Sequence, residues 1–300
     1  MFPYVQHEPN LPCFVAVLAY SHVLCGMHQK TISVLGCGWL GLPLAQELVK
    51  LGYRVKGSTT TSAKLNLLQQ AGIEPFLLSF PENSSKAQLA DFLDADVLVF
   101  NLPPSRSSNE AGTYEQLLQL VLSAAPASMK AILFVSSTSV YPDLNREVYE
   151  VDATSAAEAS SLMLRSEVLV QQAREKATIV RFGGLMGGTR HPGRFLAGKT
   201  NVPQPKAPVN MIHLADCVGI MTEIIRQEKW GMTFNACAPE HPSREDFYTK
   251  AALQLEMTPP SFALQQELQF KKINSDLLQR ELRYTFRFPD PLLCLSSPDF

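Results

Sequence analysis

Three glycines stand at the spacing G-x-G-x-x-G directly after a short β-branched, apolar run. Such a turn lets the backbone approach a diphosphate closely, and the first turn of the helix that follows offers amide donors and a partial positive charge. The residues concerned are Gly36, Gly38 and Gly41, with Trp39 and Leu40 between them. We predict that these five residues bind the diphosphate of a dinucleotide. The alternative is a glycine-rich turn without a ligand.

The segment about twenty residues beyond the glycines bears on which dinucleotide is bound. NAD-binding proteins of this type place Asp or Glu there, where the carboxylate bonds the ribose 2′-hydroxyl. This chain has hydroxyl groups and a cation instead, at Ser58, Thr59, Thr60 and Lys64. These groups suit a 2′-phosphate, which a carboxylate would repel. The sequence therefore favours NADP, with NAD as second choice; a polar loop that caps the next helix is the alternative.

The elements that must position these groups alternate between short apolar runs and amphipathic segments. Strands are predicted at 31–35, 53–57, 75–80, 95–103, 131–137 and 177–182. Helices are predicted at 40–48, 64–70, 88–93, 114–125 and 156–174. Because crossovers between parallel strands are right-handed, such repeats build a doubly wound parallel α/β sheet of the Rossmann type.

The chain changes character after Gly183, where glycines, prolines and basic residues predict irregular backbone of the kind that lines a cleft. Further elements are predicted as a strand and helix over 209–225, a strand over 231–237 and helices over 243–256 and 275–281. Ser243 is expected to be an N-cap, and so is Asp216 or the residues just before it. We therefore predict a Rossmann domain over 27–186 and a smaller C-terminal α/β substrate lobe over 187–300, with a strand or helix returning to the sheet.

Composition restricts the partners. The net charge of −2 provides no broad basic surface, so we expect a small-molecule substrate and no nucleic-acid or membrane partner. The six cysteines form no C-x-x-C pair, which predicts free thiols and no metal site. We expect a cytoplasmic protein, with a homodimer as its candidate assembly. Residues 1–26 are interpreted as a start placed too far upstream, since Met27 precedes the first strand, or as a loosely ordered extension, and less favourably as a targeting peptide.

The octapeptide FVSSTSVY over 134–141 ends the fifth predicted strand and resembles the extended short-chain dehydrogenase/reductase family, the nucleotide-sugar epimerase and dehydratase group. Segments 179–195, 209–217 and 234–239 resemble later family elements in the same order, so the resemblance covers roughly residues 30 to 290. The Trp-Leu-Gly continuation of the glycine motif is similar to short atypical members. The resemblance implies NAD(P)-dependent epimerase, dehydratase or reductase chemistry on a nucleotide-linked or phosphorylated carbohydrate.

The family employs a Ser or Thr at the end of the fifth strand and a Tyr-x-x-x-Lys pair on the next helix, whose tyrosine is the acid/base. Ser137 aligns with the hydroxyl position. No tyrosine of this chain has a lysine four residues later, and the predicted helix 156–174 contains neither residue type. Ser160 or Ser161, with Arg165, stands near the usual places of the pair.

The remaining candidates follow the strands that end near the expected cleft. Tyr141 is a second catalytic candidate, with packing as its alternative role. Cofactor-binding residues are also predicted at the end of the fourth strand, at Asn101, Leu102 and Pro103. Substrate-binding residues are predicted at His191, Arg194, Lys199 and His213. For the first three the alternative is a solvated basic loop, and for His213 it is a structural hydrogen bond.

Two other functions compete with an oxidoreductase or epimerase. The absent Tyr-Lys pair favours a catalytically degenerate, NAD(P)-binding sensor or regulatory protein. The segments GLPLA (41–45) and NLPPS (101–105) resemble the β-hydroxyacid dehydrogenases, which implies an all-helical C-terminal half. The strands predicted at 209–213 and 232–236 argue against that second alternative.

Overall fold

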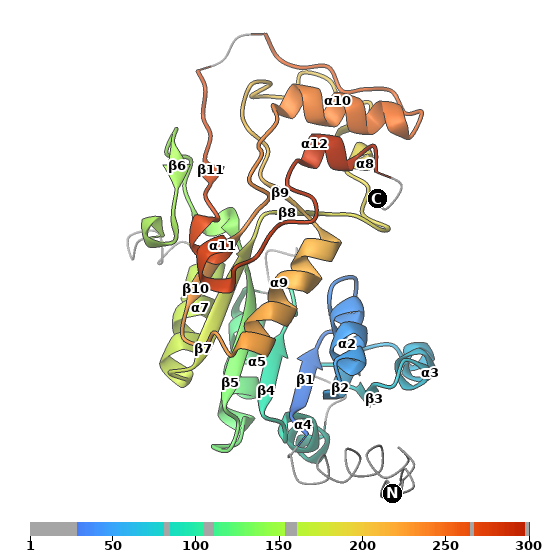
Figure 1. Ribbon diagram of the computed structural model, residues 1–300, viewed down its shortest axis with the longest axis vertical. Coiled ribbons are helices and arrows are strands. Elements are labelled where there is room, and N and C mark those ends of the chain that lie inside the picture. The colour runs from blue at the N-terminus through green and yellow to red at the C-terminus, as the bar shows by residue number, and fades with distance from the viewer. Residues whose placement is uncertain (1–28, 81–84, 105–110, 154–160, 265–266, 298–299) are drawn as a thin grey trace, which may run out of the picture.

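The computed structural model describes residues 29–80, 85–104, 111–153, 161–264, 267–297 and 300. Its largest element is a seven-stranded, all-parallel sheet in the order β10-β7-β5-β4-β1-β2-β3 (Figure 1). The strands are β1 (Thr31–Leu35), β2 (Arg54–Thr59), β3 (Glu74–Leu77), β4 (Val97–Phe100), β5 (Ala131–Ser137), β7 (Ala177–Phe182) and β10 (Thr233–Ala236). Chain order reverses between β1 and β4, which confirms the predicted doubly wound sheet.

Helices cover both faces of the sheet (Figure 1). They are α2 (Gly41–Lys50), η2 (Ser62–Lys64), α3 (Leu65–Gln70), α4 (Lys86–Leu93), α5 (Ala111–Ala124), α7 (Leu162–Ala173) and α9 (Leu214–Gln227). Helices α2 and α9 pack together on one face, where Leu44 and Ile220 belong to the same buried cluster. Helices α4, α5 and α7 share the other buried cluster. Because helices bury both faces, a central strand such as β4 is apolar and buried along its whole length.

The rest of the chain adds short elements above one end of the sheet (Figure 1). They are η3 (Thr138–Val140), β6 (Glu147–Val148), η4 (Glu150–Asp152), β8 (Gly184–Met186), α8 (Gly193–Leu196), β9 (Met211–His213), α10 (Arg244–Gln254), β11 (Lys272–Ile273), α11 (Asp276–Leu282) and α12 (Pro291–Cys294). Two small parallel pairs form, β8 with β9 and β6 with β11. Strands in this half contradict the all-helical alternative.

The predicted division after residue 186 stays a prediction. Two elements C-terminal to that point lie on the large sheet, because β10 pairs with β7 and α9 packs against α2. The Rossmann core is therefore built from both halves of the chain. The predicted extension over 1–26 lies outside the described residues.

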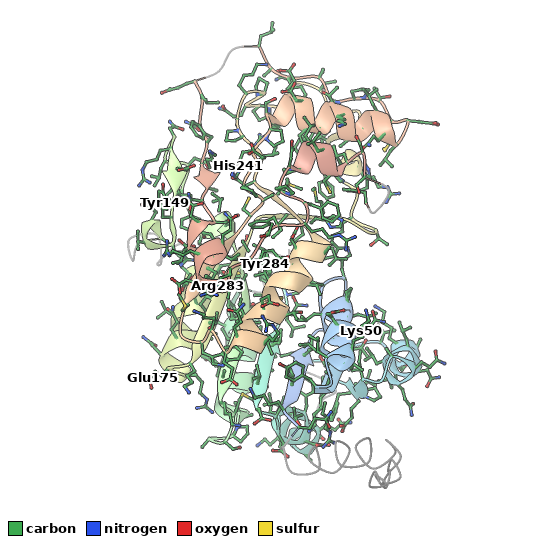
Figure 2. The ribbon with its side chains drawn as sticks, in the orientation of Figure 1. Lys50, Tyr149, Glu175, His241, Arg283 and Tyr284 are labelled. Atoms are coloured by element: carbon green, nitrogen blue, oxygen red, sulfur yellow. The ribbon has the colours of Figure 1, made fainter. Side chains whose placement is uncertain are left out.

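The structure shows which residues cap the N-termini of α9 and α10. Ser243 accepts a hydrogen bond from the amide of Asp246, so its prediction as the N-cap of α10 is confirmed. Asp216 is not the cap of α9; the Nδ1 of His213 accepts from the amide of Ala215 instead. Asp216 is wholly buried and receives a hydrogen bond from the hydroxyl of Tyr284, which Figure 2 places beside α9.

Two negative findings concern the described residues alone. No helix among them combines the length and apolar character needed to cross a bilayer. Within the same residues, no three His, Cys, Asp or Glu side chains gather into a group that could hold a metal ion.

Candidate functional site

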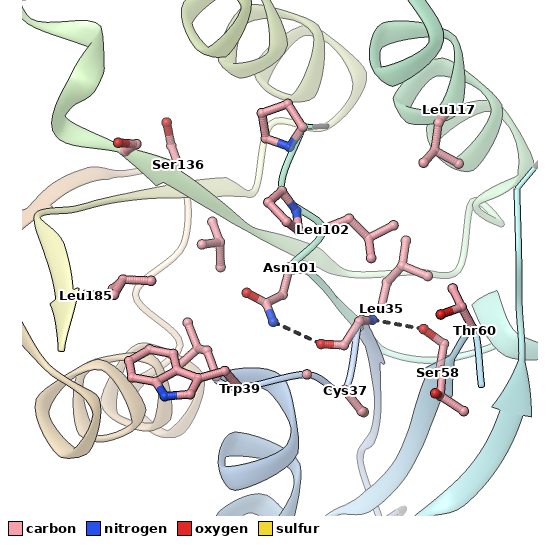
Figure 3. A pocket seen from close by; sticks show the side chains of 18 of the residues that line it. Leu35, Cys37, Trp39, Ser58, Thr60, Asn101, Leu102, Leu117, Ser136 and Leu185 are labelled. Atoms are coloured by element: carbon pink, nitrogen blue, oxygen red, sulfur yellow. Dashed lines mark hydrogen bonds between the residues drawn. The ribbon is translucent and has the colours of Figure 1, made fainter. Parts of the chain in front are cut away.

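A pocket of about 680 Å³ opens at the carboxyl ends of the central strands, where ligands lie in doubly wound sheets (Figure 3). Almost all the predicted cofactor residues line it. They are Gly36, Gly38, Trp39, Leu40, Ser58, Thr59, Thr60, Lys64, Asn101, Leu102 and Pro103. The remaining one, Gly41, packs behind the turn. The structure thus brings together side chains from the ends of β1, β2 and β4, and their roles toward a ligand stay predictions.

Each glycine of the turn has its own steric reason. Gly36 has a φ of +101°, and a Cβ there would lie 2.8 Å from the carbonyl oxygen of Asn101. A Cβ at Gly41 would lie 2.1 Å from the carbonyl oxygen of Gly36, so helix α2 can approach the turn only without a side chain. A Cβ at Gly38 would meet no atom within 4 Å. The space beside Gly38 fits a diphosphate at the N-terminus of α2.

Polar side chains from neighbouring strands shape this turn. The amide of Gly36 donates to the Oγ of Ser58 at 2.8 Å, and the Nδ2 of Asn101 donates to the carbonyl of Gly36 at 3.0 Å (Figure 3). The amide of Cys37 donates to the carbonyl of Ser58 at 2.8 Å. Burial raises the pKa of the Cys37 thiol to about 12, which keeps this cysteine neutral beside the pocket. Ser58 and Asn101 are therefore positioning residues for the glycine turn.

One end of the pocket contains the residues that the sequence predicts to bind a 2′-phosphate. The Oγ1 of Thr59 accepts from the amide of Thr61, whereas the side chains of Thr60 and Lys64 are exposed at the pocket wall. No Asp or Glu belongs to the described lining of this pocket. The neighbouring wall is apolar and suits an adenine ring, with Leu78, Phe80, Leu102 and Leu117. Thr60 and Lys64 are thus exposed polar groups at this end of the pocket, and their role toward a 2′-phosphate stays a prediction.

The opposite end contains the serines of β5. The Oγ of Ser137 accepts from the amide of Ser139 at 3.1 Å, which leaves the Ser137 proton for donation to a ligand oxygen. Ser136 is buried, and its hydroxyl donates to the Oε1 of Glu167. Ser137 is therefore the better hydrogen-bond donor of the two, and it lines the pocket.

The prediction that Tyr141 faces the cleft is wrong. Its side chain is only 2% exposed, and its hydroxyl donates to Asn235 at 2.7 Å and accepts from Arg181 at 2.6 Å. Burial raises the pKa of Tyr141 to about 12, although the charge of Arg181 and its hydrogen bond oppose the rise. The turn η3 directs Tyr141 toward the buried Arg181–Glu167 pair. Tyr141 therefore has the packing role that was the alternative to catalysis.

Helix α7 presents no proton donor at the place expected for the Tyr-Lys pair. Ser161 is its N-cap and accepts from the amide of Leu164, while Arg165 forms an ion pair with Glu115 at 2.7 Å. Ser160 lies outside the described residues. The side chain that α7 contributes to the pocket wall is Met163, next to the end of β5. A thioether cannot exchange a proton at neutral pH.

The four predicted substrate residues do not line this pocket. The Nδ1 of His191 accepts from the amide of Gly193, and its ring packs on Phe300. Arg194 and Lys199 are exposed elsewhere. His213 is buried and caps α9, and its ring centre lies 4.1 Å from that of Phe288. His213 therefore makes the structural hydrogen bond that was the alternative to substrate binding. Burial and the charge of Arg194 lower the pKa of His191.

Besides Lys64, a second cation lines the pocket: Arg190, which sequence reasoning missed. It belongs to the same basic loop as His191 and Arg194, and no linear pattern separates the three. Its guanidinium carbon lies 4.5 Å from the centre of the Trp39 ring. The Gly187-Gly188 pair predicts a turn just before Arg190, but it does not indicate which basic residue after the turn reaches the pocket.

Comparisons with known proteins agree with this geometry. No family model matches the sequence. The chain is 37% identical over 271 residues to the protein YeeZ of Escherichia coli strain K12, with 88% of this chain and 98% of YeeZ covered. Among solved structures, UDP-N-acetylglucosamine 4-epimerase from Bacillus cereus superposes with a TM-score of 0.68 at 16% identity, with 89% and 94% covered. The human epimerase family protein SDR39U1 with NADPH gives 0.62 at 19%, with 88% and 97% covered.

The parallel sheet, the glycine turn and the serine that ends β5 define an NAD-binding fold of the epimerase/dehydratase type. The chain belongs to the same family as YeeZ. Its fold is that of the extended short-chain dehydrogenases/reductases, so the fold that the sequence resemblance implies is confirmed.

Proposed function

We propose that this protein binds NADP(H) in the pocket beside the glycine turn and oxidises or reduces a phosphorylated or nucleotide-linked carbohydrate. The observation that carries the proposal is that Ser137 lines the same pocket as Gly38 and Lys64. A cofactor that spans the sheet edge from Lys64 past Gly38 would bring its nicotinamide toward Ser137. NAD is the second choice of cofactor.

The chemistry asked of the chain's own residues is modest. When bound, the nicotinamide supplies hydride transfer to or from a substrate carbon. Ser137 donates a hydrogen bond to the oxygen on that carbon and orients it. Because no tyrosine lines the described pocket, the hydroxyl proton passes to or from water rather than a side chain. Met163 and Leu185 supply apolar walls that limit the access of water elsewhere.

Ser137→Ala tests the catalytic assignment. We expect turnover of the responsive sugar nucleotide or sugar phosphate to fall about 100-fold, since one oriented donor to the reacting oxygen is lost. The dissociation constant for NADPH should change less than about twofold, because a cofactor anchored at the glycine turn does not depend on this hydroxyl. NADPH oxidation at saturating cofactor, over a panel of such substrates, measures turnover, and calorimetric titration with NADPH measures the dissociation constant.

The matched control is Ser139→Ala, which removes a neighbouring hydroxyl while the amide that Ser137 accepts from remains. Full activity in Ser137→Ala would refute the orienting role of Ser137.

Thr60→Glu tests the choice of cofactor. A carboxylate at this exposed place on the pocket wall repels a 2′-phosphate and can bond a 2′-hydroxyl. We expect the ratio of NADPH to NADH affinity to fall about tenfold or more. Lys64→Ala should lower NADPH affinity alone, and calorimetric titration with both dinucleotides measures the changes. A wild-type preference for NADH would contradict the assignment of Thr60 and Lys64.

A cofactor-binding sensor without turnover is the second candidate, and Met163 favours it. Met163 is the side chain of α7 that lines the pocket, and its thioether cannot donate a proton. Arg165 of the same helix is already paired with Glu115. NADPH binding by the wild type without turnover on any substrate of the panel would support the sensor over the enzyme.

A further inference from the structure

A cation from the C-terminal half of the chain reaches the glycine turn. Trp39 stands between the second and third glycines, and its Nε1 donates to the carbonyl of Gly187 at 3.2 Å. Arg190 lies over the same indole ring, with its guanidinium carbon 4.5 Å from the ring centre. Figure 3 shows the Trp39 indole below Leu185, on the side of the pocket where β5 ends. Trp39 thus connects the turn to the segment that follows β8.

The segment that carries Arg190 is a tight turn with little freedom. Gly187 and Arg190 exchange backbone hydrogen bonds of 3.2 and 3.1 Å. Gly187 has a φ of +107°, and a Cβ there would lie 2.4 Å from the Nε2 of His213. Because β8 pairs with β9 and His213 caps α9, this turn is held against buried structure on its far side. Arg190 is therefore presented at a defined place on the pocket wall.

The charge of Arg190 suits an anion at this place. Its side chain is exposed, and it forms no ion pair with an acidic side chain in the part of the chain that the structure describes. Guanidinium groups match phosphate oxygens with two parallel hydrogen bonds, and stacking on an indole holds the plane in position. The helix N-terminus beside Trp39 supplies only partial charge. A diphosphate carries two negative charges, so a full cation complements it.

We propose that Arg190, stacked on Trp39, binds the nicotinamide-side phosphate of the cofactor diphosphate and so ties the segment after β8 to the glycine turn. The inference rests on the proposed dinucleotide binding, but not on turnover. Lys64 lines the opposite end of the pocket and meets the 2′-phosphate. The two cations therefore serve different phosphates.

The test compares NADPH with adenosine 2′,5′-bisphosphate, which carries the 2′-phosphate and the adenosine-side phosphate but no nicotinamide-side phosphate. In calorimetric titrations of the full chain, Arg190→Ala should weaken NADPH binding about 10- to 100-fold. Binding of the bisphosphate should change less than about twofold. Arg190→Lys should recover part of the NADPH affinity, because it keeps the charge without the planar fork.

Two further variants separate local contact from general effects. Trp39→Phe keeps a ring under Arg190 but loses the hydrogen bond to Gly187, so a loss of only a few-fold is expected, and Trp39→Leu should lose more. Arg280→Ala removes one exposed positive charge from α11 and should leave both affinities unchanged.

Any one of four results would overturn the inference. Three concern the variants: unchanged NADPH affinity in Arg190→Ala, an equal loss for both ligands in Arg190→Ala, and a loss as large in Arg280→Ala. The fourth is a wild type that binds the bisphosphate but not NADPH. A wild type that binds neither ligand would refute the proposed function as well. Binding without turnover would refute only the proposed catalysis.

Discussion

The Gly38→Ala variant is expected to fold like the wild type and to lose NADPH binding. A Cβ at this position meets no protein atom within 4 Å, so the fold has room for it. The same methyl group would stand where the diphosphate must approach the backbone. We expect at least a hundredfold weaker binding, about 2.7 kcal/mol, with a change in Tm of less than about 2 °C. Fluorescence titration with NADPH and thermal unfolding measure the two effects.

Gly41→Ala is the contrasting control. Its Cβ would lie 2.1 Å from the carbonyl oxygen of Gly36 and 2.9 Å from the Nδ2 of Asn101, so the backbone itself must move. This variant should lose both stability and binding, because overpacking against backbone costs roughly 1–3 kcal/mol or more. Undiminished NADPH affinity in Gly38→Ala would place the diphosphate elsewhere and remove the basis of the proposed function.

Arg181→Met is expected to be the most destabilising single substitution among those considered. Arg181 on β7 forms an ion pair with Glu167 on α7 at 2.7 Å, and their side chains are 7% and 3% exposed. Arg181 also donates to the hydroxyl of Tyr141 and the carbonyl of Glu150. Its loss leaves a buried carboxylate without a counter-charge, which costs about 3–5 kcal/mol. Denaturation in urea, followed by circular dichroism, measures the free energy of unfolding.

Two variants control for the charge and for the cavity. Arg226→Met breaks an exposed pair with Glu223 and should cost less than about 1 kcal/mol. The double variant Arg181→Met/Glu167→Leu should recover part of the loss, since no unpaired charge remains. If Arg181→Met cost no more than Arg226→Met, the buried pair would not be a structural anchor of β7 and α7.

The β-strands were the most predictable part of the fold. The predicted bounds of β1, β5 and β7 coincide with the observed ones. Each strand is a short, mostly apolar run that is largely buried, and a glycine directly follows β1 and β7. The predicted third strand, 75–80, was placed too far along the chain; β3 covers Glu74–Leu77. It lies at the sheet edge, where burial constrains the residues less.

The candidate site also consists of a part that the local sequence predicts and a part that it does not. Local sequence determined the glycine turn, the acid-free end of β2 and the serine at the end of β5, since each follows a buried strand directly and the carboxyl ends of parallel strands share one edge. Tertiary packing decided the rest. Whether Tyr141 faced the pocket depended on Arg181, forty residues away, and which basic residue reached the pocket depended on a contact between Trp39 and Arg190. Such contacts join segments that no local pattern relates, so only the folded chain could reveal them.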